Sequence, residues 1–127
     1  MKEQAIWDVL QDLNATQDIN ASAVVSIDGL SMVSAFAPGI DEDRIGAMSA
    51  AMVSLGQRVA KEVLRGRLDH AIVHTDNGYM LFFQVNEEAL LVMTTPVNAK
   101  LGLVLFAVQN TLPALSEYCR ALGAGAA

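Results

Sequence analysis

Two histidines, His70 and His74, are the residues whose type and spacing most suggest chemistry. They lie four positions apart in a segment that we predict to be a β-strand, so their side chains share one face about 13 Å apart. Two ligands of one zinc ion, each at about 2 Å from the metal, must be far closer than that. We therefore predict no metal site and expect the two histidines at an interface or on the surface.

The other candidates for catalysis lack the surroundings that catalysis needs. Asp41, Glu42 and Asp43 form an acidic cluster, but they directly precede a predicted helix, where capping and the helix dipole account for them. Cys119 lies in an apolar helical pattern and fits a small buried hydrophobic residue. The sequence has no Gly-x-Ser-x-Gly nucleophile motif and no Gly-rich phosphate loop with its Lys. We predict no catalytic residue, no cofactor and no enzyme activity.

Composition narrows the class of protein further. The chain has 127 residues, 53% of them apolar, which suits one complete core. Its formal charge is -6 and its eight Lys and Arg are scattered along the sequence, so we expect no nucleic-acid partner. A single Cys, the lack of an export signal and apolar runs well short of the ~20 residues of a membrane span predict a cytoplasmic protein without membrane insertion.

The apolar periodicity predicts three helices and five strands. In chain order these are a helix over 2–13, strands over 23–27 and 30–36, a long helix over 41–65, strands over 68–75, 79–85 and 89–95, and a last helix that begins after residue 98.

Local signals predict where these elements turn or end. Asp28-Gly29 predicts a two-residue hairpin turn with both residues at positive φ, and Asp76-Asn77-Gly78 predicts another hairpin. Asp41 is the expected N-cap of the long helix and Gly66 its left-handed stop. Asn98 is the expected cap of the last helix, and Pro113 predicts a kink or break near Gln109. We expect the domain to span residues 1–122 and a frayed tail to span 123–127.

The long helix carries more apolar surface than one sheet can cover. Its large apolar side chains spread over about half the circumference, wider than the ~100° stripe of an ordinary surface helix. A natural division gives Val53, Ala60 and Leu64 to one neighbour and Met48, Met52, Leu55 and Val59 to another, with the choice of which neighbour is the sheet left open. Each large side chain left bare forfeits about 1.5–3 kcal/mol of burial, so we expect a second copy of the chain to cover the surplus. The alternative is a helix sunk deeper into its own domain.

The strand over 68–75 is the second sign of self-association. It contains no Pro, and Asp69 is its only protecting charge, so as an outer strand it would expose an open ladder. Pairing with a second copy would close this edge. We therefore predict a dimer interface formed by the second group of long-helix residues together with His70, Ile72 and His74.

Several segments resemble the roadblock family, also called dynein light chain roadblock, of the roadblock-longin and profilin-like superfamily in its bacterial or archaeal type. The resemblance covers nearly the whole chain. The matching segments are Ala23-Val24-Val25-Ser26-Ile27-Asp28-Gly29-Leu30, Gly78-Tyr79-Met80-Leu81, Leu90-Leu91-Val92 and Leu101-Gly102-Leu103-Val104.

The resemblance implies an α+β fold of element order α-β-β-α-β-β-β-α. Its five-stranded antiparallel sheet has the order 2-1-5-4-3, with one long helix on one face and the terminal helices on the other. It also implies a homodimer that joins through strand three and the long helix. The partner it implies is a small Ras-like GTPase, whose GTP hydrolysis some relatives stimulate by repositioning its switch regions.

For this chain we predict that the partner surface is the polar side of the long helix, formed by Ala47, Ala50, Ser54 and Arg58. Two alternatives remain open at this point. One is a small-molecule sensory module of the PAS or GAF type, which shares the sheet order but needs a cavity between sheet and helices. The other is a scaffold with no GTPase partner.

Overall fold

The computed structural model describes the backbone of residues 2–15 and 18–126. Its elements are α1 (Lys2–Ala15), β1 (Ala21–Ser26), β2 (Ser31–Ala35), α2 (Glu42–Glu62), β3 (His70–Thr75), β4 (Gly78–Gln84), β5 (Ala89–Thr95) and α3 (Leu101–Ala126). The five strands form one antiparallel sheet in the order β2-β1-β5-β4-β3. The predicted fold class and strand order are therefore confirmed.

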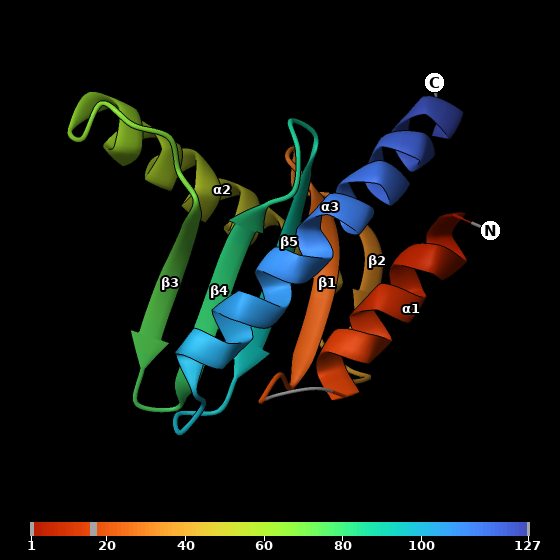
Figure 1. Cartoon of the computed structure of the whole chain (residues 1–127), viewed down its shortest axis with the longest axis horizontal. Coiled ribbons are helices and arrows are strands. Elements are labelled where there is room, and N and C mark those ends of the chain that lie inside the picture. Colours follow the sequence, from red (N-terminus) through yellow and green to blue (C-terminus); the bar gives the residue numbers. More distant parts are fainter. Residues whose placement is uncertain (1, 16–17, 127) are drawn as a thin grey trace.

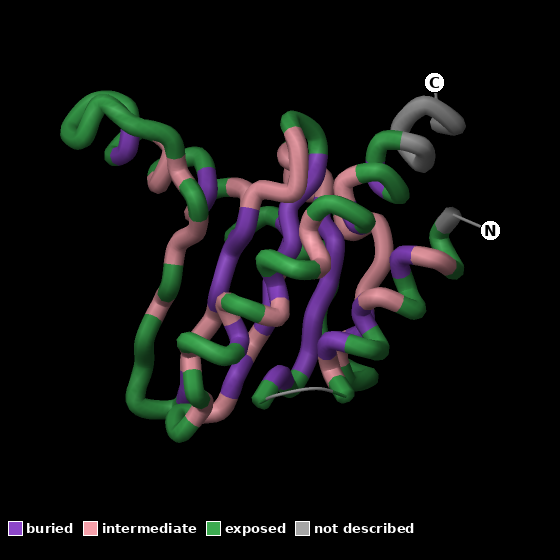
Figure 2. Tube along the Cα trace, in the orientation of Figure 1, coloured by how far each residue is buried: buried purple, intermediate pink, exposed green. Residues whose placement is uncertain are grey.

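Helices cover both faces of the sheet. Helices α1 and α3 lie side by side on one face and α2 crosses the other (Figure 1). Because both faces are covered, the central strands β1 and β5 are buried almost throughout, as the tube view shows (Figure 2). Val24 and Leu91 pack under α1 and α3, whereas Val25 and Leu90 pack under α2.

Helix α1 is held against the sheet by a stripe of buried apolar side chains and by two hydrogen bonds of Asn14. Ile6, Leu10 and Leu13 recur at helical spacing and are buried. At the end of the helix, the Asn14 side chain donates to the Ala35 carbonyl at 3.1 Å and accepts from the Ser22 hydroxyl at 2.8 Å. These two hydrogen bonds join α1 to β1 and β2.

The first hairpin differs from the prediction. Strand β1 ends at Ser26 and β2 begins at Ser31, and the register shifts between Val24 and Val25, so the connection is longer than two residues. Gly29 has a φ of 93°, but Asp28 does not take positive φ. The prediction failed because the Ser26 amide bonds to the Leu30 carbonyl at 2.8 Å and closes a wider loop.

The second hairpin is confirmed. Thr75 pairs with Gly78 across the turn of Asp76 and Asn77, and Gly78 has a φ of 137°.

The start of α2 is confirmed and its end is corrected. Asp41 is the N-cap and accepts from the Arg44 amide at 3.1 Å. The helix ends at Glu62 rather than 65, and Arg65, not Gly66, takes the left-handed conformation, with a φ of 52°. Gly66 instead donates its amide to the Ala60 carbonyl at 2.8 Å.

The last helix begins later and runs further than expected. Its first residue is Leu101, so the cap position falls on Lys100, and the prediction that Asn98 caps the helix is wrong. The Lys100 amide bonds to the Asp18 carboxylate at 3.3 Å. Pro113 lies inside one unbroken helix, so the break predicted near Gln109 does not occur. Pro113 has no amide to bond the Gln109 carbonyl, but both residues are exposed and water can bond that carbonyl instead. The helix extends to Ala126, past residue 122, and the domain boundary stays a prediction.

Candidate interaction surface

The inner face of α2 is made of small residues that let the helix approach the sheet closely. Gly46, Ser49, Val53 and Ala60 are buried there. A side chain at Gly46 would collide with the carbonyl of Gly29 in the β1–β2 connection. The neighbour of Val53 is therefore the sheet, where it packs with Phe82 and Leu90. Ala60 is buried on the same side of the helix.

The outer side of α2 presents apolar side chains to solvent. Met48, Leu55 and Val59 are 56%, 57% and 46% exposed, and Met52 is half-buried beside them. Their spacing of four, three and four residues places them on one side of the helix. We call Met48, Met52, Leu55 and Val59 the α2 apolar stripe.

Leu64 does not belong with Val53 and Ala60, so that part of the predicted division is wrong. Helix α2 ends two residues before it, and Leu64 is 73% exposed. Its neighbour Val63 is 71% exposed. Both residues lie where the end of α2 extends beyond β3 at the edge of the sheet (Figure 1).

Strand β3 is the outer strand beside this end of α2, and its far edge is open. Its residues alternate between the two faces of the sheet. His70, Ile72 and His74 pair with Phe83, Leu81 and Tyr79, which belong to the core under α1 and α3. The three predicted interface residues of β3 therefore face away from α2.

The predicted dimer interface is thus divided between the two faces of the sheet. The α2 apolar stripe lies on one face, and His70, Ile72 and His74 lie on the other. Of the β3 residues that share the face of the stripe, Ala71 and Val73 pack against the core under α2. The sequence did not predict Ala71 and Val73 as interface residues, because it does not show which alternate residues of β3 face α2.

The two histidine rings lie against aromatic rings of β4. His74 stacks on Tyr79, with ring centroids 4.3 Å apart and an angle of 11° between the planes. His70 lies beside Phe83 at 5.6 Å and 39°. Within the described part of the chain, no group of three or more His, Cys, Asp or Glu residues could hold a metal ion.

The predicted partner surface lies on the other flank of α2. Ala47, Ser54 and Arg58 are exposed and Ala50 is half-buried. The Arg58 guanidinium pairs with Glu62 at 3.0 Å, an exposed pair that contributes little stability. We call these four residues the α2 polar flank.

Two contacts fix the direction in which the polar flank faces. Ala47, the first residue of the flank, lies beside Gly29 of the β1–β2 connection. On the same side, Gln57 donates to Gln84 at the end of β4 at 2.6 Å. The flank therefore faces the end of the sheet that carries the β1–β2 and β4–β5 connections.

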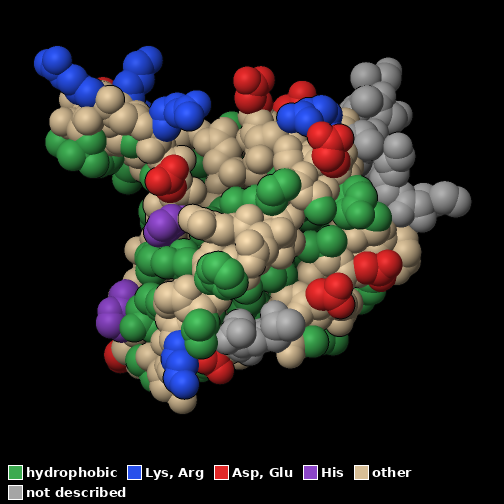
Figure 3. All heavy atoms as spheres, in the orientation of Figure 1, with side chains coloured by type: hydrophobic (Ala, Val, Ile, Leu, Met, Phe, Trp, Pro, Cys, Tyr) green, Lys and Arg blue, Asp and Glu red, His purple; other side chains and the backbone are tan. Residues whose placement is uncertain are grey.

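Basic residues gather at the C-terminal end of α2. Arg58, Lys61, Arg65 and Arg67 are four of the eight Lys and Arg of the chain, and the space-filling view shows Lys and Arg side chains at this corner of the molecule (Figure 3). Half of the basic residues are therefore concentrated at this end of α2, both in the sequence and in space.

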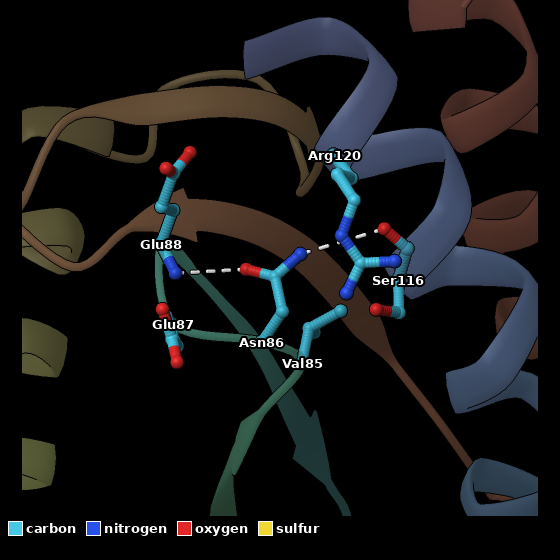
Figure 4. Close-up of a pocket in the computed structure, with 6 residues that line it drawn as sticks. All are labelled: Val85, Asn86, Glu87, Glu88, Ser116 and Arg120. Atoms are coloured by element: carbon cyan, nitrogen blue, oxygen red, sulfur yellow. Dashed lines mark hydrogen bonds between the residues drawn. The ribbon is translucent and has the colours of Figure 1, made fainter. Parts of the chain in front are cut away.

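A surface depression of about 400 Å³ lies between the β4–β5 connection and α3, and Asn86 dominates its wall (Figure 4). The Asn86 side chain accepts from the amides of Glu88 at 2.8 Å and Ala89 at 3.0 Å, and it donates to the Ser116 carbonyl at 3.4 Å. Glu87 and Glu88 lie on the far side of Asn86 from Arg120. The polar groups of Asn86 already have partners within the chain. We therefore interpret this depression as a structural contact between the β4–β5 connection and α3, and not as a ligand site.

Cys119 lies in the core under α1 and α3, at 3% exposure. Burial raises the pKa of its thiol from 9.0 to about 11. A thiol with so high a pKa is a poor nucleophile near neutral pH. None of the described helices combines the length and apolar character that crossing a bilayer requires.

Comparison with known sequences identifies relatives along most of the chain. The family model described as the Roadblock/LC7 domain matches residues 5–95. Two uncharacterized proteins of Methanocaldococcus jannaschii, MJ0310 and MJ1340, are each 33% identical over 96 residues, which cover 76% of this chain and 83% of the relative.

Solved structures share the fold. Myxococcus xanthus MglB superposes with a TM-score of 0.84 at 18% identity, over 92% of this chain and 96% of that one. A Roadblock/LC7 domain from Streptomyces avermitilis gives 0.82 at 14% identity, over 88% and 95%. A Schizosaccharomyces pombe profilin gives 0.61 at 13% identity, over 97% and 99%.

Proposed function

Because this chain belongs to the Roadblock/LC7 domain family, we propose that it is a homodimeric, non-catalytic regulator or scaffold of the cytoplasm that binds a small Ras-like GTPase. The observations that carry the proposal are the exposed α2 apolar stripe and the open edge of β3. These two features leave apolar side chains and backbone groups without a partner in a single chain.

A second copy of the chain is the partner that fits both features at once. A two-fold axis perpendicular to the sheet would pair β3 with β3 and continue the sheet through both subunits. The same axis would bring the two α2 helices together on one face, so that each stripe covers the other. Burying Met48, Leu55 and Val59 would contribute about 1.5–3 kcal/mol for each side chain that becomes fully buried. MglB, whose fold this chain shares, has been solved in a tetrameric arrangement.

The GTPase would bind the α2 polar flank. In the proposed pair this flank stays outside the contact, since at about 100° per residue its centre lies about 120° around the helix from the centre of the stripe. Its small residues Ala47, Ala50 and Ser54 leave room for a partner's loops, and Arg58 supplies one charge. We infer that docking repositions the switch regions of the GTPase, so that the residues which hydrolyse GTP belong to the GTPase itself.

The dimer is tested by placing charge in the stripe. We expect Leu55→Glu together with Val59→Glu to weaken self-association at least a hundredfold, because the pair would bury four uncompensated carboxylates, each costing a few kcal/mol. Light scattering would then report the 13.5 kDa mass of one chain instead of twice that mass. Ser54→Glu is the control, since it places a carboxylate on the polar flank of the same helix and leaves the stripe unchanged. A wild-type chain that is monomeric at high micromolar concentration would contradict the proposal.

The GTPase surface is tested with the complementary variant. We expect Ser54→Trp together with Arg58→Glu to abolish capture of a small GTPase from the same genome, loaded with a non-hydrolysable GTP analogue, while light scattering still reports a dimer. Single-turnover GTP hydrolysis with the wild-type chain separates a stimulator from a scaffold. Unchanged capture by the variant would remove the polar flank as the binding surface.

A further inference from the structure

The two histidines of β3 stand at the one edge of the sheet where a second copy would join. His70 and His74 point to the face of α1 and α3, with Ile72 between them on the same face. At four residues' separation they are about 13 Å apart along the strand, too far to share a metal ion within one chain. The alignment of the two β3 strands therefore decides which groups of the partner lie beside each histidine.

The symmetry of the pair limits the possible alignments of the two strands. A two-fold axis perpendicular to the sheet maps each face onto itself, so residues that lie opposite each other must point to the same face. The axis must then pass beside a residue and not between two residues. Since β3 spans His70–Thr75, an axis at Ile72 or at Val73 pairs the most residues.

An axis at Ile72 brings the exposed Ile72 side chain against the Ile72 side chain of the partner. We favour this alignment because it buries apolar surface of both side chains. In this alignment His70 lies directly opposite the partner's His74, and His74 lies opposite the partner's His70. Directly opposite residues of antiparallel strands have Cβ atoms about 4.5–5.5 Å apart. An axis at Val73 still places His74 diagonal to the partner's His70, at about 7–8 Å.

We propose that β3 pairing assembles a site for a divalent transition-metal ion, Zn²⁺ in the first place, from His70 of one subunit and His74 of the other. Neutral imidazole binds zinc, copper and nickel, with a Zn–N distance of about 2.0–2.1 Å. Two imidazoles that start from Cβ atoms about 5 Å apart can both reach one ion, and water can complete its coordination. The proposal rests on the homodimer of the proposed function.

The surroundings of the histidines favour such a site. Tyr79 stacks on one face of the His74 ring, and Phe83 lies beside His70. These aromatic contacts limit the movement of the imidazoles. His74 is exposed and His70 is half-buried, so both side chains keep surface that a partner can reach. The symmetry generates two equivalent sites in each dimer.

The test is a calorimetric titration of the whole chain with ZnCl₂ after treatment with chelator. We expect two Zn²⁺ ions per dimer for the wild type and none at these sites for His70→Gln or for His74→Gln, each checked by light scattering to remain a dimer. At a Zn²⁺ concentration ten times the site dissociation constant, two linked sites should tighten wild-type self-association by about a hundredfold.

Mixing the two variants provides the decisive control. In a mixed dimer of one His70→Gln chain and one His74→Gln chain, both substitutions fall in the same site. The other site keeps both of its histidines, so each mixed dimer should bind one Zn²⁺ ion. A site within one chain would be lost in both variants and could not be recovered by mixing. A wild-type dimer that binds no Zn²⁺, or a mixture that recovers none, would overturn the metal site while leaving the dimer in place. A monomeric wild type would instead overturn the dimer.

Discussion

Gly78 occupies a position that only glycine can fill, and this leads to a prediction at the scale of one residue. It has a φ of 137°, and a Cβ placed there would collide with the carbonyl of Thr95. We expect Gly78→Ala to lower the free energy of unfolding by about 2–4 kcal/mol, through backbone strain and displacement of β5. Urea unfolding at one fixed protein concentration measures the change.

Gly102→Ala is the matched control for Gly78→Ala. Gly102 lies in the first turn of α3, and a Cβ there meets no atom within 4 Å. Alanine favours the helix over glycine, so this variant should be as stable as the wild type or more stable by up to about 1 kcal/mol. Equal losses in the two variants would contradict the explanation from the Gly78 backbone.

Cys119 makes stability depend on pH in the alkaline range. Its pKa is raised by burial to about 11 in the folded chain, against 9.0 as its ordinary value. The unfolded chain therefore releases the thiol proton at a lower pH than the folded chain does. The stabilisation is complete below pH 9 and is lost as pH rises through 11, by about 2–3 kcal/mol in total.

The measurement for Cys119 compares urea unfolding of the wild type and of Cys119→Ala between pH 8 and pH 11. The variant lacks the thiol but keeps the Tyr and Lys groups that titrate in the same range. The difference between the two curves should therefore shrink as pH rises. A constant difference across this range would contradict the raised pKa.

Single residues were predictable from the sequence where their role depends only on their near neighbours. Asp41 caps α2 as predicted, because its side chain meets an amide three residues later. Gly66 and Asn98 were predicted with the same reasoning and were wrong. The end of α2 is set by bonds of the Leu64 and Gly66 amides to carbonyls of the last turn. The start of α3 is set by a bond to Asp18, which is far away in sequence.

Helix α2 depends on close approach to the sheet, and Gly46 tests this at the scale of an element. A Cβ at Gly46 would collide with the carbonyl of Gly29, which belongs to the backbone and cannot turn aside. We expect Gly46→Ala to destabilise the chain by about 1–3 kcal/mol even after the gain in helix propensity. Thermal and urea unfolding at one protein concentration report the loss.

Gly56→Ala is the graded control on the same helix. Its Cβ would lie 3.1 Å from the Cδ2 atom of Leu68, a flexible side chain that can move aside. The loss should therefore be smaller than for Gly46→Ala. If Gly56→Ala proved the more damaging of the two, the close contact between α2 and the β1–β2 connection would not be what limits the position of the helix.

At this scale the sequence predicted that α2 has a surplus of apolar surface but not how that surface is divided. The periodicity placed Met48, Leu55 and Val59 on one side correctly, and the structure leaves all three exposed. It could not predict that Leu64 follows the end of the helix. Nor could it predict that the histidines of β3 and the α2 apolar stripe lie on opposite faces, because that depends on how helix and strand are oriented in space.

For the molecule as a whole, the element pattern and the topology had different origins. Apolar periodicity and turn residues predicted three helices and five strands in the observed order. The strand order β2-β1-β5-β4-β3 came from the resemblance to roadblock proteins, since nothing in the periodicity of β1 indicates that it pairs with β5.

The pairing of β1 with β5 also bears on how the chain folds. Ala21 pairs with Thr94 and Ser26 with Ala89, so the centre of the sheet joins two segments from opposite ends of the sequence. The β1–β2 hairpin and the β3–β4–β5 meander each contain only local contacts and can form early. Joining them closes a loop that contains all of α2, and high contact order of this kind slows folding. During synthesis on the ribosome, β1 must therefore wait without its central neighbour until β5 has emerged.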